Sequence, residues 1–250
     1  ATWGPHHSVQ SDNFLGKNAA EFGSAYLTNS HQFAVTDACV TCHMVATTDT
    51  GTVNRDKVGG HSFRLENPEN GYEHTTACTN CHGPITSFDD FIAPTDYDGD
   101  GSVESVSGEV DGLLHNLSVL LPPTGIDSIS WQMIKDMNDL TVKKSYWNYQ
   151  LINNDGSKGM HNSKFTFDVL VKTLAALGSV IPVELVSFDA QVGNNGVTLK
   201  WETASELNNR GFEIERSIKG NWATVGFVEG KGTTTEYSKY SFTDKPNTSN

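Results

Sequence analysis

Cys39-Val40-Thr41-Cys42-His43 and Cys78-Thr79-Asn80-Cys81-His82 are two copies of one short pattern, and together they contain every cysteine of the chain. Thiols at this spacing occur in zinc ribbons, in redox dithiols and in segments that bind haem covalently. Only the haem interpretation gives a role to the histidine after each pair, because the thiols bond to the vinyl groups and the imidazole ligates the iron. The sequence therefore predicts two haem c groups, with Cys39, Cys42, Cys78 and Cys81 as thioether residues and His43 and His82 as iron ligands.

Each iron then takes a sixth ligand or stays open for chemistry. Seven further histidines are available, namely His6, His7, His31, His61, His74, His115 and His161. His115 falls beside the apolar stripe of a helix expected over residues 108–121, so we expect it to be a surface or hydrogen-bonding residue. His74 is too close to Cys78 in sequence to be a convincing ligand.

The order of these motifs resembles the C-terminal haem pair of multihaem cytochromes, of which the pentahaem ammonia-forming nitrite reductases are the best-known members. The resemblance covers residues 1–178 and includes Ser30-His31, Gly60-His61 and His161-Asn162. It implies that His31 pairs with His82 at one iron and His161 with His43 at the other.

In that family the position of His61 ligates a haem for which this chain has no motif. Three roles stay open for His61: a ligand to a haem of another subunit, a replacement for one of the two distal histidines, or none. The family's open catalytic haem has no counterpart here, and its active-site histidine matches His6-His7 only loosely. We therefore expect no catalytic activity.

An acidic stretch from Asp96 to Val103 matches the first eight positions of a calcium-binding loop. Asp96, Asp98 and Asp100 stand at alternate positions, and Gly101 allows the sharp turn. Position 12 is a serine instead of the usual glutamate. We expect Glu104 or Glu109 to supply the missing carboxylate, because three aligned carboxylates repel one another without a cation. The alternative is a solvated acidic turn.

The fold class expected is α+β with two domains. Residues 1–180 form a loop-rich, mainly helical dihaem domain, with helices over 19–27, 108–121, 138–151 and from Asn162 or Ser163 to Leu177. Residues 181–250 alternate apolar and polar side chains in five short segments, with turn signals at 193–196 and 208–211. They resemble the fibronectin-type-III-like modules of type IX-secreted proteins, although two of the seven strands are missing.

Composition limits the remaining alternatives. The chain has 30 acidic against 17 basic residues and a formal charge of -13, which argues against a nucleic-acid partner. No apolar run is long enough to span a bilayer, and the start at Ala1 is consistent with signal-peptide removal.

We therefore expect an extracellular or cell-surface electron carrier, with the periplasm as second choice. Its partners would be redox proteins or extracellular electron acceptors. It would also self-assemble, because spare histidines and open sheet edges favour contacts between copies. The alternative is an enzyme, or a redox subunit of one, with an open haem site.

Overall fold

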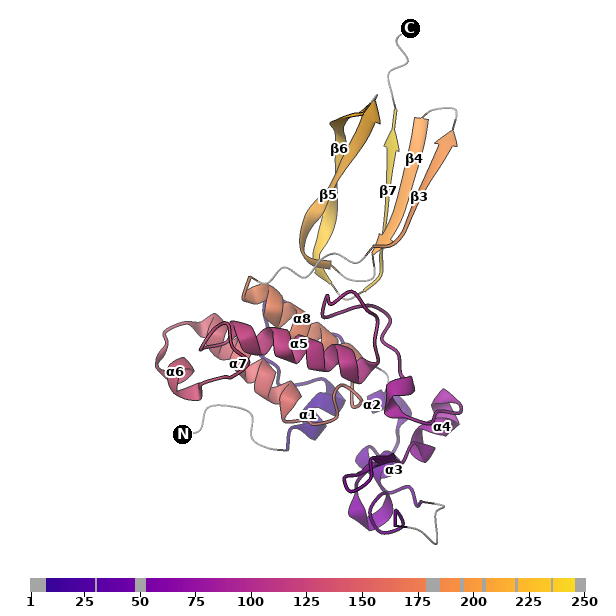
Figure 1. The fold of residues 1–250 in the computed structure, drawn as a ribbon, viewed down its shortest axis with the longest axis vertical. Coiled ribbons are helices and arrows are strands. Elements are labelled where there is room, and N and C mark those ends of the chain that lie inside the picture. Colours follow the sequence, from indigo (N-terminus) through magenta and orange to yellow (C-terminus); the bar gives the residue numbers. More distant parts are fainter. Residues whose placement is uncertain are drawn as a thin grey trace.

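The computed structural model describes residues 8–29, 31–47, 53–178, 185–193, 196–203, 206–218, 220–234 and 236–245. It is an α+β structure in which all the described helices precede the five long antiparallel strands β3 to β7, while the short strands β1 and β2 lie between α3 and α4 (Figure 1). The helices are α1 Gln10–Leu15, α2 His31–Ala34, α3 Cys39–His43, α4 Thr76–His82, α5 Val106–Leu120, α6 Trp131–Asp136, α7 Leu140–Asn153 and α8 Ser163–Ala176. The strands are β1 Glu66–Asn67, β2 Tyr72–Glu73, β3 Leu185–Gly193, β4 Gly196–Thr203, β5 Glu206–Ile218, β6 Asn221–Thr234 and β7 Ser238–Asp244, and the 3-10 turns are η1 Gly60–Ser62 and η2 Phe88–Asp90.

The larger hydrophobic core lies among α5, α7 and α8. Leu113 and Leu117 on α5, Leu151 on α7, and Phe165 and Leu170 on α8 are fully buried. Leu113 and Leu117 are four residues apart, as are the buried Leu170 and Leu174 on α8, so each pair lies on one face of its helix. The expected helices over 108–121, 138–151 and 162–177 are therefore present, with ends shifted by one or two residues.

Side chains cap all three of these helices. Ser105 accepts a hydrogen bond from the Gly108 amide at the start of α5. Asp139 accepts from Thr141 and Val142 at the start of α7. Asn162 accepts from the Phe165 amide at the start of α8, and this is the cap expected from the sequence.

The helix expected over residues 19–27 is wrong, because this segment is extended and bent. Its backbone groups bind side chains of other helices instead of one another. Asn148 accepts from the Ala20 amide at 2.7 Å and donates to the Ala20 carbonyl at 3.0 Å, and Asp168 accepts from the Leu27 amide at 2.8 Å. Tertiary hydrogen bonds thus replace the local ones, which helix propensity cannot anticipate.

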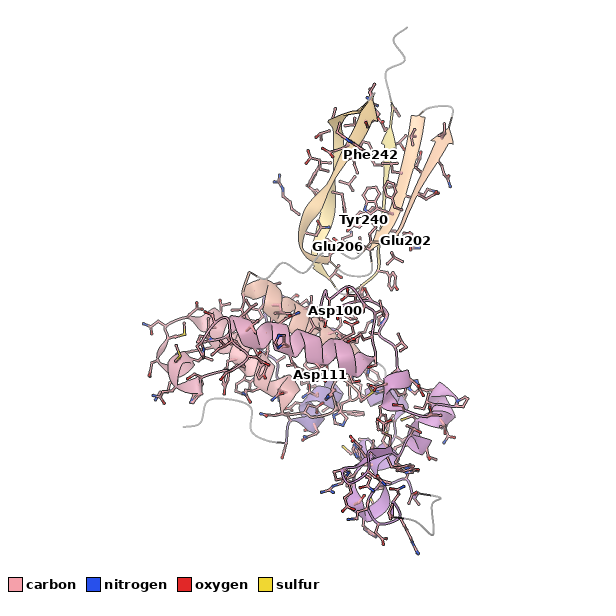
Figure 2. All side chains as sticks on the ribbon, in the orientation of Figure 1. Asp100, Asp111, Glu202, Glu206, Tyr240 and Phe242 are labelled. Carbon is pink, nitrogen blue, oxygen red and sulfur yellow. The ribbon has the colours of Figure 1, made fainter. Side chains whose placement is uncertain are left out.

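β1 and β2 pair with each other, and the strands from residue 185 onward form two further antiparallel sheets, one in the order β3-β4-β7 and one of β5 with β6. A second hydrophobic cluster lies between them and is centred on Trp201, Ile214 and Tyr240. Figure 2 shows Tyr240 and Phe242 in this interior. The opposite face of the β3-β4-β7 sheet is polar, with an ion pair of 2.7 Å between Lys239 and Glu202.

Five strands occur where five were expected, but the turn expected at 208–211 is wrong. These residues lie inside β5, which pairs with β6 through register irregularities near Asn209 and Gly211. The Asn and Gly residues of this stretch mark bulges in a continuous strand instead of the end of a hairpin. The turn signal at 193–196 and the domain boundary at 180–181 include residues outside the described part of the chain. None of the described helices has the length and apolarity needed to cross a membrane.

Candidate functional site

The two cysteine motifs fold as short helices. Cys39, Cys42 and His43 lie on α3, and their spacing of three and four residues places all three side chains on one helix face. Cys78, Cys81 and His82 have the same arrangement on α4. The helices α3 and α4 contact each other and lie beside the main helical core (Figure 1).

His31, at the start of α2, meets His82 of α4. Their ring centroids are 5.9 Å apart and the ring planes are perpendicular, at 89°. The ring of Phe91 also contacts His82, edge-on, with a centroid distance of 5.0 Å. This pair joins the two residues that the family resemblance assigned to one iron.

His43 of α3 meets His161, which precedes α8. Their ring centroids are 6.1 Å apart and the ring planes are tilted by 48°. The Nδ1 atom of His43 lies 3.0 Å from the carbonyl oxygen of Phe63, and the Nδ1 atom of His161 lies 2.8 Å from Oδ1 of Asp155. Both acceptors require a proton on Nδ1, so the Nε2 atom of each neutral ring carries a free lone pair. Burial lowers the pKa of His43, with a smaller contribution from His161, which favours the neutral ring.

Asn162 connects the backbone segments that carry the two distal histidines. Its Oδ1 atom accepts from the Asn29 amide at 3.0 Å, two residues before His31. Its Nδ2 atom donates to the Thr28 hydroxyl at 2.7 Å. Because Asn162 also caps α8, one side chain fixes His161 and the approach to His31 relative to the helical core.

The other histidines have different surroundings. His61 lies exposed in η1 and forms no ring contact with another histidine of the described chain. His74 is fully buried, and its Nε2 atom bonds the Val45 carbonyl at 3.0 Å. His115 is exposed and pairs with Asp127 at 3.2 Å, so it is a surface hydrogen-bonding residue, as expected. His6 and His7 lie outside the described residues.

The arrangement of the thiols favours neither alternative site. All four cysteines are free. Burial is the main cause that raises the pKa of Cys42 and of Cys78, whereas a redox dithiol needs a lowered thiol pKa. Among the described residues, only carboxylates gather three or more metal-ligating atoms within 4.8 Å of one another.

Apolar side chains near the motif helices face outward. Phe33 is 82% exposed, Val40 50%, Phe63 45% and Met44 40%, and neither α2, α3 nor α4 has a buried residue. The aromatic ring of Phe63 stacks on His43, with centroids 4.6 Å apart. A cluster of exposed apolar side chains is typical of a surface that contacts a large apolar ligand or a partner.

The acidic stretch forms a compact loop before α5. Ligating oxygens of Asp96, Asp98 and Glu109 lie within 4.8 Å of one another, and so do those of Asp98, Asp100 and Glu104. Burial raises the pKa of Asp98 to about 6, with further contributions from the neighbouring Glu109 and Asp100 carboxylates. Glu109 is fully buried, and burial raises its pKa despite hydrogen bonds from three backbone amides.

Two glycines of α5 leave space for this loop. A Cβ atom on Gly112 would lie 1.6 Å from Oδ2 of Asp98, and one on Gly108 would lie 2.7 Å from Oε2 of Glu104. These glycines are four residues apart and therefore share one helix face. Figure 2 shows Asp100 on the loop and Asp111 on the neighbouring α5 helix.

Asp155 and Phe63 contact the paired histidines, but no sequence pattern predicts them as site residues. Neither belongs to a motif, and each reaches a histidine through the fold. Phe63 has a positive φ of 57°, which is rare for an aromatic residue, and no sequence pattern indicates it. The proximity of Asp155 to His161, six residues later in the chain, is the only signal that could have suggested their pairing.

Neither the family models, nor the curated proteins, nor the solved structures that we compared with this chain contain a match.

Proposed function

We propose that this chain is a dihaem c-type cytochrome that carries electrons, with each iron held between two histidines. The observation that supports the proposal most strongly is the meeting of two histidine pairs, His31 with His82 and His43 with His161. Each pair contains one motif histidine and one histidine from a distant segment.

The distances fit two imidazoles on opposite sides of one metal ion. A ligating imidazole nitrogen lies about 2 Å from its metal, so the ring centroids of two opposed ligands are roughly 6 Å apart. The observed distances are 5.9 Å and 6.1 Å. Opposed ligands can rotate about their common axis, so interplanar angles of 89° and 48° are both compatible with this arrangement.

The residues of the chain have separate roles in this proposal. Cys39, Cys42, Cys78 and Cys81 would attach the two haems through thioether bonds. The haem c group supplies a one-electron iron couple when bound. The exposed Phe33, Val40 and Met44 would pack against apolar porphyrin surface, which explains why the motif helices bury no residue within the protein. Phe63 and Asp155 orient the His43 and His161 rings.

Two histidines for each iron would leave no open position, so the proposal favours a carrier over the alternative, an enzyme with an open haem site. The test is the absorption spectrum of the purified ferric protein before and after addition of cyanide. We expect a low-spin spectrum that cyanide changes only slowly. A high-spin band, together with rapid cyanide binding at one haem, would support the enzyme alternative.

We also infer that the acidic loop holds a calcium ion through Asp96, Asp98 and Glu109, with Asp100 and Glu104 close by. Carboxylate oxygens are the ligands that calcium prefers. The raised pKa values of Asp98 and Glu109 express the cost of gathering these charges, which a divalent cation would offset. The ion would fix the loop against α5.

For the strands, we propose a partial fibronectin-type-III-like sandwich that mediates self-assembly. β3 is an edge strand, because it pairs with β4 alone in the described sheet. All nine of its residues are exposed, including Phe188 at 58% and Val192 at 88%. A long apolar edge strand is a template for pairing with another chain, and we propose that a second copy pairs there. His61, which is exposed in η1, would then serve a neighbouring subunit.

The assembly proposal is tested by light scattering and electron microscopy of the native protein and of Val192→Lys. We expect particles larger than one chain mass for the native protein and dissociation for the variant, because an edge lysine opposes strand pairing. The matched control is Met133→Lys, at an exposed position of α6, and it should leave the assembly intact. A native protein that is monodisperse at one chain mass would contradict the proposal.

The same proposal places the protein outside the cytoplasm, at the cell surface or in the extracellular space. Type IX-secreted proteins carry modules similar to the β3–β7 segment in sequence, and covalent haem attachment is a property of exported cytochromes. Redox proteins or extracellular acceptors would be its electron-transfer partners. Detection of the protein in the medium or surface fraction of intact cells would support this location, and detection in the cytoplasm alone would contradict it.

A further inference from the structure

The ring of His161 is bound to a carboxylate that is almost fully buried. Nδ1 of His161 lies 2.8 Å from Oδ1 of Asp155, and the Asp155 side chain is only 3% exposed. The second oxygen of Asp155 accepts a hydrogen bond from the Ser157 hydroxyl. Both carboxylate oxygens are therefore engaged, and the carboxylate cannot rotate away from the ring without breaking both bonds.

The position of Asp155 is unfavourable for a carboxylate unless it has a partner. It follows the C-terminal end of α7, where the helix dipole disfavours negative charge. Burial adds to this cost, since a buried carboxylate needs a hydrogen-bonded or charged partner. The backbone holds the residue in place, because Gln10 donates to the Asp155 carbonyl at 3.3 Å. The fold thus buries the Asp155 carboxylate, at a cost in free energy, in direct hydrogen-bond contact with the His161 ring.

The other three paired histidines have no such partner. His43 bonds the neutral carbonyl of Phe63. His82 contacts the ring of Phe91. Among the residues that the structure describes, no carboxylate forms an ion pair with His31, His43 or His82. The two histidine pairs therefore differ in charge environment as well as in sequence position.

The geometry points to Asp155 as a positioning residue that makes the iron of the His43/His161 pair the harder of the two to reduce. This inference rests on the proposed dihaem function. A carboxylate that accepts the Nδ1 proton fixes the imidazole tautomer and raises the basicity of the ligating nitrogen. A more basic ligand stabilises ferric iron over ferrous iron and so lowers the reduction potential. The nearby negative charge acts in the same direction, because the ferric state carries one more positive charge.

The test is a spectroelectrochemical titration of the holoprotein and of Asp155→Asn. For the native protein we expect two midpoint potentials. In Asp155→Asn, which keeps the size and an oxygen acceptor but removes the charge, we expect only the lower potential to rise. The expected change in the reduction equilibrium is at least tenfold, or about 59 mV for a one-electron couple. Asp155→Glu, which keeps the charge, should restore most of the native value.

Asp127→Asn is the matched control. Asp127 also pairs with a histidine, His115, but this pair is exposed and includes none of the four proposed iron ligands. Its substitution should move neither potential. Unchanged potentials in Asp155→Asn, or an equal rise of both, would overturn the inference, and so would a loss of stability with no change of potential. None of these outcomes contradicts the proposed function. The proposed function fails only if the native chain lacks two low-spin haems.

Discussion

The imidazole of His31 lies perpendicular to that of His82, with 5.9 Å between the ring centroids, although the two residues belong to different helices. His43 and His161 lie at a similar centroid distance, 6.1 Å, with their ring planes tilted by 48°. In each pair, one histidine follows a Cys-x-x-Cys pair directly and the other comes from a segment anchored by Asn162. Each pair thus joins one motif histidine to one histidine from a distant segment.

Removal of a distal histidine should affect one iron only. In His31→Gly we expect one haem to become high-spin while the other stays low-spin, and in His161→Gly the reverse, because each iron loses one of its two protein ligands. Electron paramagnetic resonance of the ferric protein distinguishes the two spin states. His115→Ala, the exposed control, should leave both haems low-spin. Two low-spin haems in either glycine variant would show that a different residue ligates that iron.

His61 should be dispensable for the ligation of both irons within one chain. It is exposed in η1 and lies outside both histidine pairs. His61→Ala should therefore keep two low-spin haems in protein dispersed as single chains. A high-spin signal in dispersed His61→Ala would mean that His61 replaces one of the proposed distal ligands.

Calcium should stabilise the protein more at pH 7 than at pH 5. Without a cation, the pKa of Asp98 is about 6 in the folded state against an ordinary value of 3.8. The stabilising contribution of this carboxyl group is therefore complete below pH 3.8 and is lost as the pH rises through 6. Calcium needs the ionised form, so its binding offsets that loss. At a concentration 100 times the dissociation constant we expect about 2.7 kcal/mol, measured as a rise in Tm.

Gly112→Ala tests calcium binding by the same loop through a steric clash with Asp98. An alanine in a helix interior ordinarily stabilises by about 1 kcal/mol relative to glycine. Here the added methyl group would meet the Asp98 carboxylate at 1.6 Å, so we expect lower stability and loss of the calcium effect on Tm. Asp111→Asn, on the exposed side of the same helix, should preserve the calcium effect. An unchanged Tm of the native protein with and without a chelator would show that the loop binds no cation.

The interior of the strand region depends on Glu206. This fully buried carboxylate accepts hydrogen bonds from Thr203, Asn209, the Lys231 amide and Tyr240, at 2.5 to 2.9 Å. Burial alone raises its pKa, but these bonds outweigh burial and lower the pKa below 4.5. Its stabilising contribution is therefore present above pH 4.5 and is lost as the pH falls through the lower folded value.

Glu206→Gln should reduce the free energy of unfolding by about 2 kcal/mol at pH 7, because bonds to a charged group are stronger than neutral ones. Glu202→Gln removes a surface ion pair with Lys239 and should cost less than about 1 kcal/mol. Figure 2 shows both glutamates on the strands. Equal effects of the two substitutions in urea unfolding would refute the buried hydrogen-bond network.

Local patterns in the sequence predict the helices with strong apolar periodicity and the five strands after residue 180, but not the short strands β1 and β2. Leu113, Leu117 and Leu121 needed only helical spacing to reveal a buried face. The segment 19–27 was mispredicted because Asn148 and Asp168, more than a hundred residues away, bind its backbone. The bulges of β5 were read as a turn, because Asn and Gly favour both.

In the candidate site too, local patterns predict some residues, and tertiary contacts determine the others. The Cys-x-x-Cys-His motifs are local and could be identified directly. The pairing of the distal histidines was an expectation from family resemblance alone. The contacts that orient them, from Phe63 and Asp155, arise from tertiary packing around η1 and the end of α7, which no local pattern encodes.

The haem content of the purified chain tests the central claim most directly. A pyridine haemochrome assay, combined with the mass of the denatured polypeptide, measures how many haems are attached covalently. We predict two haem c groups per chain that survive denaturation, one for each Cys-x-x-Cys-His motif. A chain that carries no covalent haem, or that carries zinc on its cysteines instead, would contradict the account.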